Sequence, residues 1–126
     1  MIKSIILVGL GSCAGGMLRY AVSLLLHTGK AGFPAATFLV NIAGCLLIGL
    51  IYGIFSRLTD TSSSLCLLLT TGFCGGFTTF SAFSNEALKM LQNGNHTGCL
   101  LYVLGSIVLG ILAIAAGYLI VRLLFR

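Results

Sequence analysis

The segment Gly72–Ser84, with the sequence GFCGGFTTFSAFS, decides how the rest of this chain is interpreted. It lies within an apolar stretch, yet its thirteen residues include three glycines, four phenylalanines and four hydroxyl side chains. Two glycines followed by two threonines disfavour a continuous helix. Within a membrane, a helix break is tolerated only where the freed backbone groups are buried in protein or line a polar site. Broken helices are also where membrane proteins build ion sites, so we expect such a site here.

The composition is that of a membrane protein. Of the 126 residues, 58% are hydrophobic and 7% are charged, and the mean hydropathy is +1.12. Asp60 and Glu86 are the only acidic residues, against seven lysines and arginines that are scattered singly. Scattered basic residues are typical of anchors at lipid headgroups, so we expect no nucleic-acid or nucleotide partner. The five cysteines form neither a CxxC pair nor a Cys/His cluster, which indicates buried side chains rather than disulfides or metal ligands.

Four segments are long enough to cross a bilayer, which requires about 20 mostly apolar residues. They cover residues 4–26, 33–56, 64–91 and 98–124, with short polar connections between them. The sequence therefore predicts an all-α membrane protein in which residues 1–126 form a single transmembrane domain. The third of its four helices is expected to be broken near its middle.

The basic residues give only a weak orientation signal. With four spans they divide four against two: Lys3, Arg57, Arg122 and Arg126 on one side, Lys30 and Lys89 on the other. The excess weakly favours cytoplasmic termini, but so small a bias also suits insertion in both orientations, which would give an antiparallel homodimer. A four-helix protein of this size can hardly enclose a lined pore alone, so an oligomer is expected on size too.

Small residues recur at helical spacing. Gly11 and Gly15 are four residues apart, as are Gly49 and Gly53. This spacing lets helices approach closely where lipid supplies no hydrophobic drive between them. We expect these pairs to mark helix packing rather than a functional site.

Two charged residues fall inside the predicted spans. Arg19 lies within the first span, where a buried charge is costly and marks function or a structural partner. Because Arg19 is only eight residues before His27, its side chain could instead reach the membrane interface. Glu86 is the only acid within a span and is a candidate partner for a basic group.

Two polar pairs each share a helical face. Thr37 and Asn41 are four residues apart in the second span, and Tyr102 and Ser106 stand in the same relation in the fourth. Their hydroxyl and amide donors can replace water around an anion, although hydrogen bonding between helices remains an equal alternative for each pair.

Phe80 and Phe83 follow the expected break. An aromatic ring has a positive edge, so ring edges turned into a pathway can solvate an anion. Phenylalanines in membranes usually face lipid or the core. The interleaved Thr78, Thr79 and Ser81 make this stretch too polar for a simple lipid-facing stripe.

The motif GGFTTFSAF at residues 75–83 resembles the GGFTTFSTF signature of the Fluc (CrcB) fluoride channels. The elements GGMLRY at 15–20 and NIAG at 41–44 also match, and the resemblance covers the whole chain. It implies an antiparallel, dual-topology homodimer with two fluoride pathways in a plasma membrane, which would be the inner membrane if the source is a Gram-negative bacterium.

The resemblance also assigns residues to the fluoride pathway. Phe80 and Phe83 would contact the ion with their ring edges, and Asn41 would be a donor. A polar track would lead along the pathway, formed by Thr37, Tyr102 and Ser106.

The family further holds a structural Na⁺ at the dimer centre. By position, its ligands would be the main-chain carbonyls of Gly75 and Thr78 from both subunits.

Two departures from the family pattern concern hydroxyl groups. Ala82 replaces the usual threonine of the signature, and Gly110 lacks the hydroxyl that would extend the track one turn past Ser106.

The expected function is passive, fluoride-selective conduction that exports cytoplasmic fluoride and protects the cell from its toxicity; no enzyme activity is expected. The alternative is a small four-helix multidrug exporter. Such a proton-coupled carrier needs a carboxylate in its first span, where this chain has Arg19 and no acid. A purely structural protein would need neither Asn41 nor a broken third span.

Overall fold

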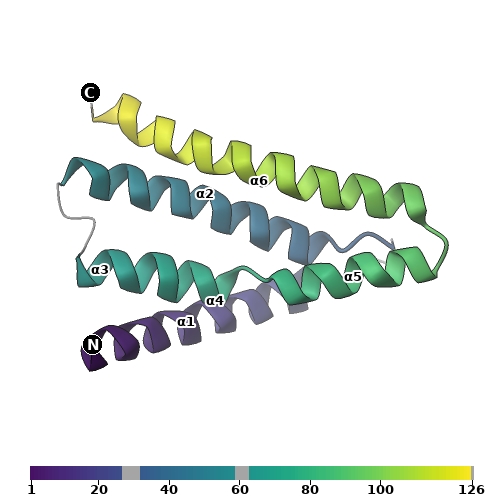
Figure 1. Cartoon of the computed structure of the whole chain (residues 1–126), viewed down its shortest axis with the longest axis horizontal. Coiled ribbons are helices and arrows are strands. Elements are labelled where there is room, and N and C mark those ends of the chain that lie inside the picture. The colour runs from purple at the N-terminus through teal and green to yellow at the C-terminus, as the bar shows by residue number, and fades with distance from the viewer. Residues whose placement is uncertain (27–31, 59–62, 126) are drawn as a thin grey trace.

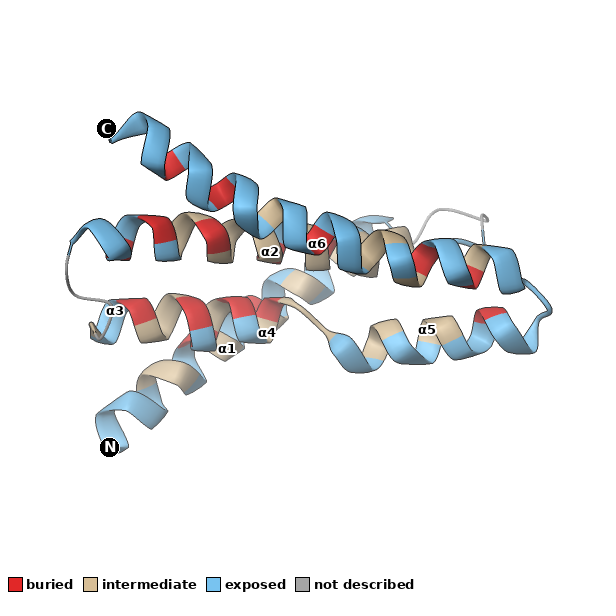
Figure 2. Ribbon diagram, turned by 45° about the horizontal axis from the view of Figure 1, so that its top comes forward, coloured by how far each residue is buried: buried red, intermediate tan, exposed pale blue. Residues whose placement is uncertain are grey.

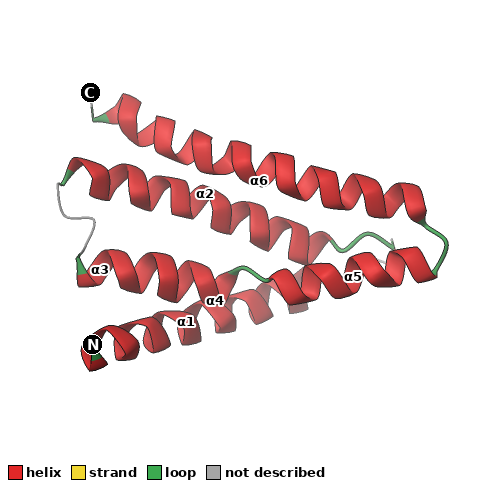
Figure 3. Ribbon diagram, viewed as in Figure 1, coloured by secondary structure: helices red, strands yellow, loops and turns green. Residues whose placement is uncertain are grey.

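The structure, a computed structural model, describes residues 1–26, 32–58 and 63–125. Within these ranges it is helical and has no strand (Figure 3). Four helical runs are long and apolar enough to cross a membrane: α1 (Ile2–Leu26), α2 (Ala35–Arg57), the run Ser64–Gln92, and α6 (His96–Leu124). The prediction of an all-α protein with four membrane-spanning helices is thereby confirmed.

The third run consists of several segments. In chain order they are α3 (Ser64–Leu67), the π-helical η1 (Leu68–Cys74), α4 (Gly75–Phe77) and α5 (Phe80–Gln92). Between α4 and α5 the backbone is extended, with φ −80° and ψ 161° at Thr78 and φ −149° and ψ 123° at Thr79. Figure 3 shows this short non-helical link in the middle of the run. The α5 helix then begins with a side-chain cap, since the Ala82 N–H donates to Thr79 Oγ1 at 3.3 Å.

The helices pack in an uneven bundle. The α2 and α6 helices lie side by side along much of their length, and α1 packs against η1 and α4 (Figure 1). The α5 helix instead packs against the first turns of α6. Both termini lie at the same end of the bundle (Figure 1).

Glycines allow the helix backbones to touch. At Gly15 of α1, an added Cβ would overlap the Phe73 carbonyl of η1. At Gly49 of α2, an added Cβ would overlap the Ile114 carbonyl of α6. These two contacts are of the small-residue kind that associates helices in lipid by close van der Waals packing.

The buried residues lie between the helices, and the outward faces are apolar and exposed (Figure 2). Tyr102 is 1% exposed and packs with Met90 and Cys99, while Phe38 and Phe83 lie partly buried against this cluster. A surface of exposed leucines and isoleucines suits a helix bundle whose solvent is lipid.

Of the basic residues in the orientation count, Lys30 and Arg126 lie outside the described residues. The Arg57 guanidinium donates to the carbonyls of Phe125 and Arg122 at 3.2 and 3.3 Å, and so binds the C-terminal end of α6. The direction of insertion stays a prediction.

Gly49→Ala should destabilise the protein by about 1–3 kcal/mol, because α2 and α6 must separate to admit the methyl group. Gly105→Ala is the matched control, since an added Cβ there has no atom within 4 Å. The apparent melting temperature in detergent should fall for the first variant and not for the second. Equal melting temperatures for both would contradict the tight α2–α6 contact.

Candidate functional site

The extended residues between α4 and α5 are held by a side chain from α2. The Thr79 N–H donates to Asn41 Oδ1 at 2.8 Å, and Asn41 Nδ2 donates to the Thr79 carbonyl at 3.1 Å. One amide side chain thus satisfies both backbone groups of one residue. This leaves the second N–H of the Asn41 amide for another acceptor.

Two carbonyls at the interruption lose their usual helical donors. In a continuous α-helix the Thr79 N–H would donate to the Gly75 carbonyl, and the Ala82 N–H to the Thr78 carbonyl. Here the first N–H binds Asn41, and the second binds Thr79 Oγ1. Within the described residues, the carbonyls of Gly75 and Thr78 therefore lack the N–H donors that a continuous α-helix would give them.

Glu86 is the acceptor of two hydroxyl groups. Thr37 Oγ1 donates to its Oε1 at 2.7 Å, and Tyr102 Oη donates to its Oε2 at 2.8 Å. These bonds link α5 to α2 and α6. Glu86 was a candidate partner for a basic group, but among the described residues its carboxylate has hydroxyl partners instead.

The aromatic residues form a connected row. The ring centroids of Phe80 and Phe83 are 6.0 Å apart with an interplanar angle of 36°, and the Phe83 centroid lies 5.0 Å from that of Tyr102. Phe33 continues the row, with its centroid 5.6 Å from Tyr102 in an edge-to-face arrangement. The row leads from the interruption toward the start of α2.

A cavity of about 320 Å³ brings together four of the predicted pathway residues, namely Asn41, Phe80, Phe83 and Ser106. Its lining also includes Thr78 and Thr79 of the interruption. The Ser106 hydroxyl donates to the Tyr102 carbonyl at 2.6 Å, so its oxygen lone pairs rather than its proton are available. Phe80 is 79% exposed in the single chain, and this cavity is therefore open on its ring side.

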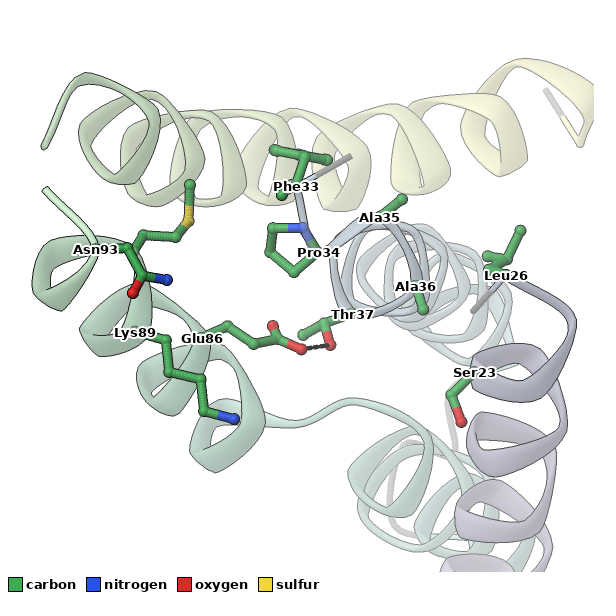
Figure 4. A pocket seen from close by; sticks show the side chains of 12 residues that line it. Ser23, Leu26, Phe33, Pro34, Ala35, Ala36, Thr37, Glu86, Lys89 and Asn93 are labelled. Atoms are coloured by element: carbon green, nitrogen blue, oxygen red, sulfur yellow. Dashed lines mark hydrogen bonds between the residues drawn. The ribbon is translucent and has the colours of Figure 1, made fainter. Parts of the chain in front are cut away.

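Thr37 and Tyr102 lie apart from this cavity. Thr37 and Glu86 instead line two further cavities, of about 380 and 270 Å³, which also share Ser23 and Ala36. Figure 4 shows the larger one, with the Thr37–Glu86 hydrogen bond at its side. Two separate hollows thus meet at one hydrogen bond between α2 and α5.

The remaining predicted residues take distinct places. Arg19 lines the smaller of these two cavities together with Glu86 and Thr79, and its side chain is half-buried. Ser81 is exposed, and its Oγ lies 3.4 Å from Thr79 Oγ1. Ala82 also lines the smaller cavity, which means that its missing hydroxyl lies away from the cavity of the phenylalanine pair.

Sequence reasoning missed two lining residues. Cys45 lines the cavity of the phenylalanine pair, and its Sγ would be 3.3 Å from a Cβ at Gly110. Cys45 follows Asn41 by four residues, so helical spacing alone could have placed it on that face. Lys89 lines the 380 Å³ cavity and follows Glu86 by three residues, which is the same kind of signal.

Metal-ligating side chains do not gather within the described ranges. No group of three or more His, Cys, Asp or Glu residues could hold a metal ion there, and the cysteines are free thiols.

Comparison with known proteins shows the family. Residues 6–118 match the family model described as CrcB-like protein, Camphor Resistance (CrcB). A relative from Phocaeicola vulgatus, named fluoride-specific ion channel FluC, is 46% identical and is covered over 95% of its length by 91% of this chain. Relatives of the same name from Flavobacterium psychrophilum and Erwinia tasmaniensis are 43% and 39% identical, over 95% and 99% of this chain and 98% and 100% of their own lengths. The chain belongs to the CrcB family, a family of multi-pass membrane proteins and not of enzymes.

Asn41→Ala should leave the Thr79 N–H and carbonyl without partners, at a cost of about 1–3 kcal/mol for each buried group. Backbone amide exchange at Thr79 should become much faster, and the melting temperature should fall. Asn93→Ala is the control, since that side chain is exposed at the end of α5. Unchanged protection of the Thr79 amide in the Asn41 variant would show that the amide bridge does not hold the interruption.

Proposed function

We propose that this protein is a passive, fluoride-selective channel. The observation that carries the proposal is membership of the CrcB family, with relatives named fluoride-specific ion channels that match over nearly their whole lengths. The cavity lined by Asn41, Phe80 and Phe83 supports it, because an amide donor and two aromatic rings can together replace the water around a small anion.

Fluoride is small and tightly hydrated, so conduction depends on replacing its water in steps. The positive edges of Phe80 and Phe83 supply one substitute for water, and the second N–H of the Asn41 amide supplies another. Several weak sites in series let the ion leave as readily as it enters. The Thr79 backbone fixes the Asn41 amide, so this donor does not need to be ordered when the ion arrives.

The hydroxyls of Thr37 and Tyr102 differ from the Asn41 amide because their protons are already donated to an acceptor. Both hydroxyls donate to Glu86, so an anion gains these donors only by replacing the carboxylate as their acceptor. This exchange would cost the Glu86 carboxylate a charge-assisted hydrogen bond, so the anion must offset that loss. For Ser106 to extend this track as a donor, its hydroxyl would have to release the Tyr102 carbonyl, to which it donates at 2.6 Å.

In the membrane, the interruption at Thr78 and Thr79 makes the third span a broken helix, and two chains form an antiparallel, dual-topology homodimer. A Na⁺ ion at the dimer centre would bind the carbonyls of Gly75 and Thr78 from both chains. The diverted N–H donors support this assignment, because they leave these oxygens available to a hard cation. When bound, the ion neutralises the dipoles of the interrupted backbone. The exposed Gly75 and Phe80 suit a surface that a second chain covers.

The multidrug-exporter alternative is not favoured. It requires a carboxylate in the first span, and α1 contains no acidic residue. The names of the relatives also point to fluoride.

Purified protein in liposomes loaded with potassium fluoride should release fluoride rapidly when valinomycin is added, with no matching release of chloride. Phe80→Ile should reduce the rate at least tenfold, since isoleucine has no positive ring edge. Phe125→Ile is the control, because Phe125 is exposed at the end of α6, away from the Phe80 cavity. A folded wild-type protein without fluoride flux would overturn the proposal.

The same pair of variants tests export and protection in cells. An inside-negative potential favours anion exit by about 2.3 kcal/mol per charge per 100 mV. Expression of the wild type or of Phe125→Ile should restore growth of a fluoride-sensitive host in fluoride, and Phe80→Ile should not. Equal growth of cells that express any of the three proteins would contradict a role of fluoride conduction in protecting the cell.

Native mass spectrometry tests the assembly. We expect a mass of two chains carrying one bound Na⁺, and a lower melting temperature after exchange into sodium-free buffer. A monomer, or a dimer whose melting temperature does not depend on Na⁺, would contradict the corresponding part of the proposal.

A further inference from the structure

The 380 Å³ cavity has one charge of each sign among the described residues that line it. Glu86 is its acid and Lys89 is its base. Its other lining residues are neutral, and several are apolar: Leu26, Phe33, Pro34, Ala35, Ala36 and Met90. The lining also includes the polar Ser23, Thr37 and Asn93, and Lys89 is exposed, so these two charges act on an entering ion to an extent that depends on ionic strength.

The Glu86 charge is a barrier to an anion. Its carboxylate oxygens are held by Thr37 and Tyr102, which are neutral donors and leave the negative charge in place. An anion that approaches the Thr37 hydroxyl from this cavity therefore meets a like charge beside its donor. Like charges at a few ångströms repel strongly in surroundings of low dielectric constant.

Lys89 is placed to offset this charge. It follows Glu86 by three residues on α5, so the two side chains lie on one helical face. Figure 4 shows both projecting from α5 toward the cavity. Within the described residues the Lys89 ammonium forms no ion pair. No carboxylate therefore neutralises its charge, which can act on an ion in the cavity.

We propose that Lys89 is the charge-compensating residue of the pathway entrance: its ammonium offsets the Glu86 carboxylate and draws small anions into the 380 Å³ cavity. This inference rests on the proposed anion conduction. It adds a role that is electrostatic and long-range, so it requires neither a direct contact between Lys89 and the ion nor a fixed Lys89 rotamer. Arginine should replace Lys89, and a neutral residue should not.

The test uses fluoride release from liposomes at two ionic strengths, set on both sides by an impermeant potassium salt. The Debye length is about 30 Å at 10 mM and about 3 Å at 1 M, so a charge effect should be large in the first condition and nearly absent in the second. We compare the wild type with Lys89→Gln, Lys89→Arg and Lys3→Gln. Lys3 is a matched control because it is exposed at the start of α1 and does not line this cavity.

At low ionic strength, Lys89→Gln should conduct roughly three- to tenfold less than the wild type, in the range expected for electrostatic steering. At high ionic strength the two rates should converge, and Lys89→Arg and Lys3→Gln should follow the wild type throughout.

Three results would overturn the inference. The Lys89→Gln rate could equal that of the wild type at low ionic strength, which would leave Lys89 as a headgroup anchor only. The loss could be the same at both ionic strengths, or be shared by Lys89→Arg, which would indicate packing. If the wild type conducts fluoride and one of these results is obtained, only the inference about Lys89 is wrong. If the wild type shows no fluoride flux, both the channel proposal and the inference about Lys89 are wrong.

Discussion

The two hydrogen bonds between the Asn41 side chain and the Thr79 backbone are the interaction on which the site depends. Lipid offers no partner for an exposed N–H or carbonyl, and each unsatisfied group there costs several kcal/mol, roughly. Both backbone groups of the extended Thr79 are hydrogen-bonded because α2 brings an amide side chain to them. The same two bonds fix the Asn41 donor, free the Gly75 carbonyl, and set where α5 begins.

Close helix packing makes that interaction possible. Asn41 reaches Thr79 because α2 approaches the interruption closely, and Gly44 one turn away permits this: an added Cβ there would overlap Thr78 Cγ2. Gly15 and Gly49 do the same for α1 against η1 and for α2 against α6. Small residues thus position the polar site indirectly, through the distance between backbones.

In the proposed anion pathway, Glu86 places a negative charge beside the hydroxyl donors Thr37 and Tyr102. Its hydrogen bonds to Thr37 and Tyr102 order two hydroxyls and join three helices, so the carboxylate has a clear structural use. Its charge opposes an anion all the same. Arg19 lines the cavity on one side of the Thr37–Glu86 bond and Lys89 the cavity on the other, so each hollow contains one base.

The sequence by itself determined the four apolar helices, because bilayer thickness fixes how long an apolar run must be. It also predicted a helix break within Gly72–Ser84, since glycine pairs and β-branched residues are poor helix formers, whereas only the structure places the extended residues at Thr78 and Thr79. Only the tertiary structure decided the partners: Asn41 with the Thr79 backbone, Glu86 with two hydroxyls rather than a base, and Cys45 and Lys89 as cavity residues. Such helices are apolar on almost every side, so their pattern does not encode which face turns inward or how deep each helix sits. Rotation and depth follow from close packing at the glycines, and these set which distant side chains meet.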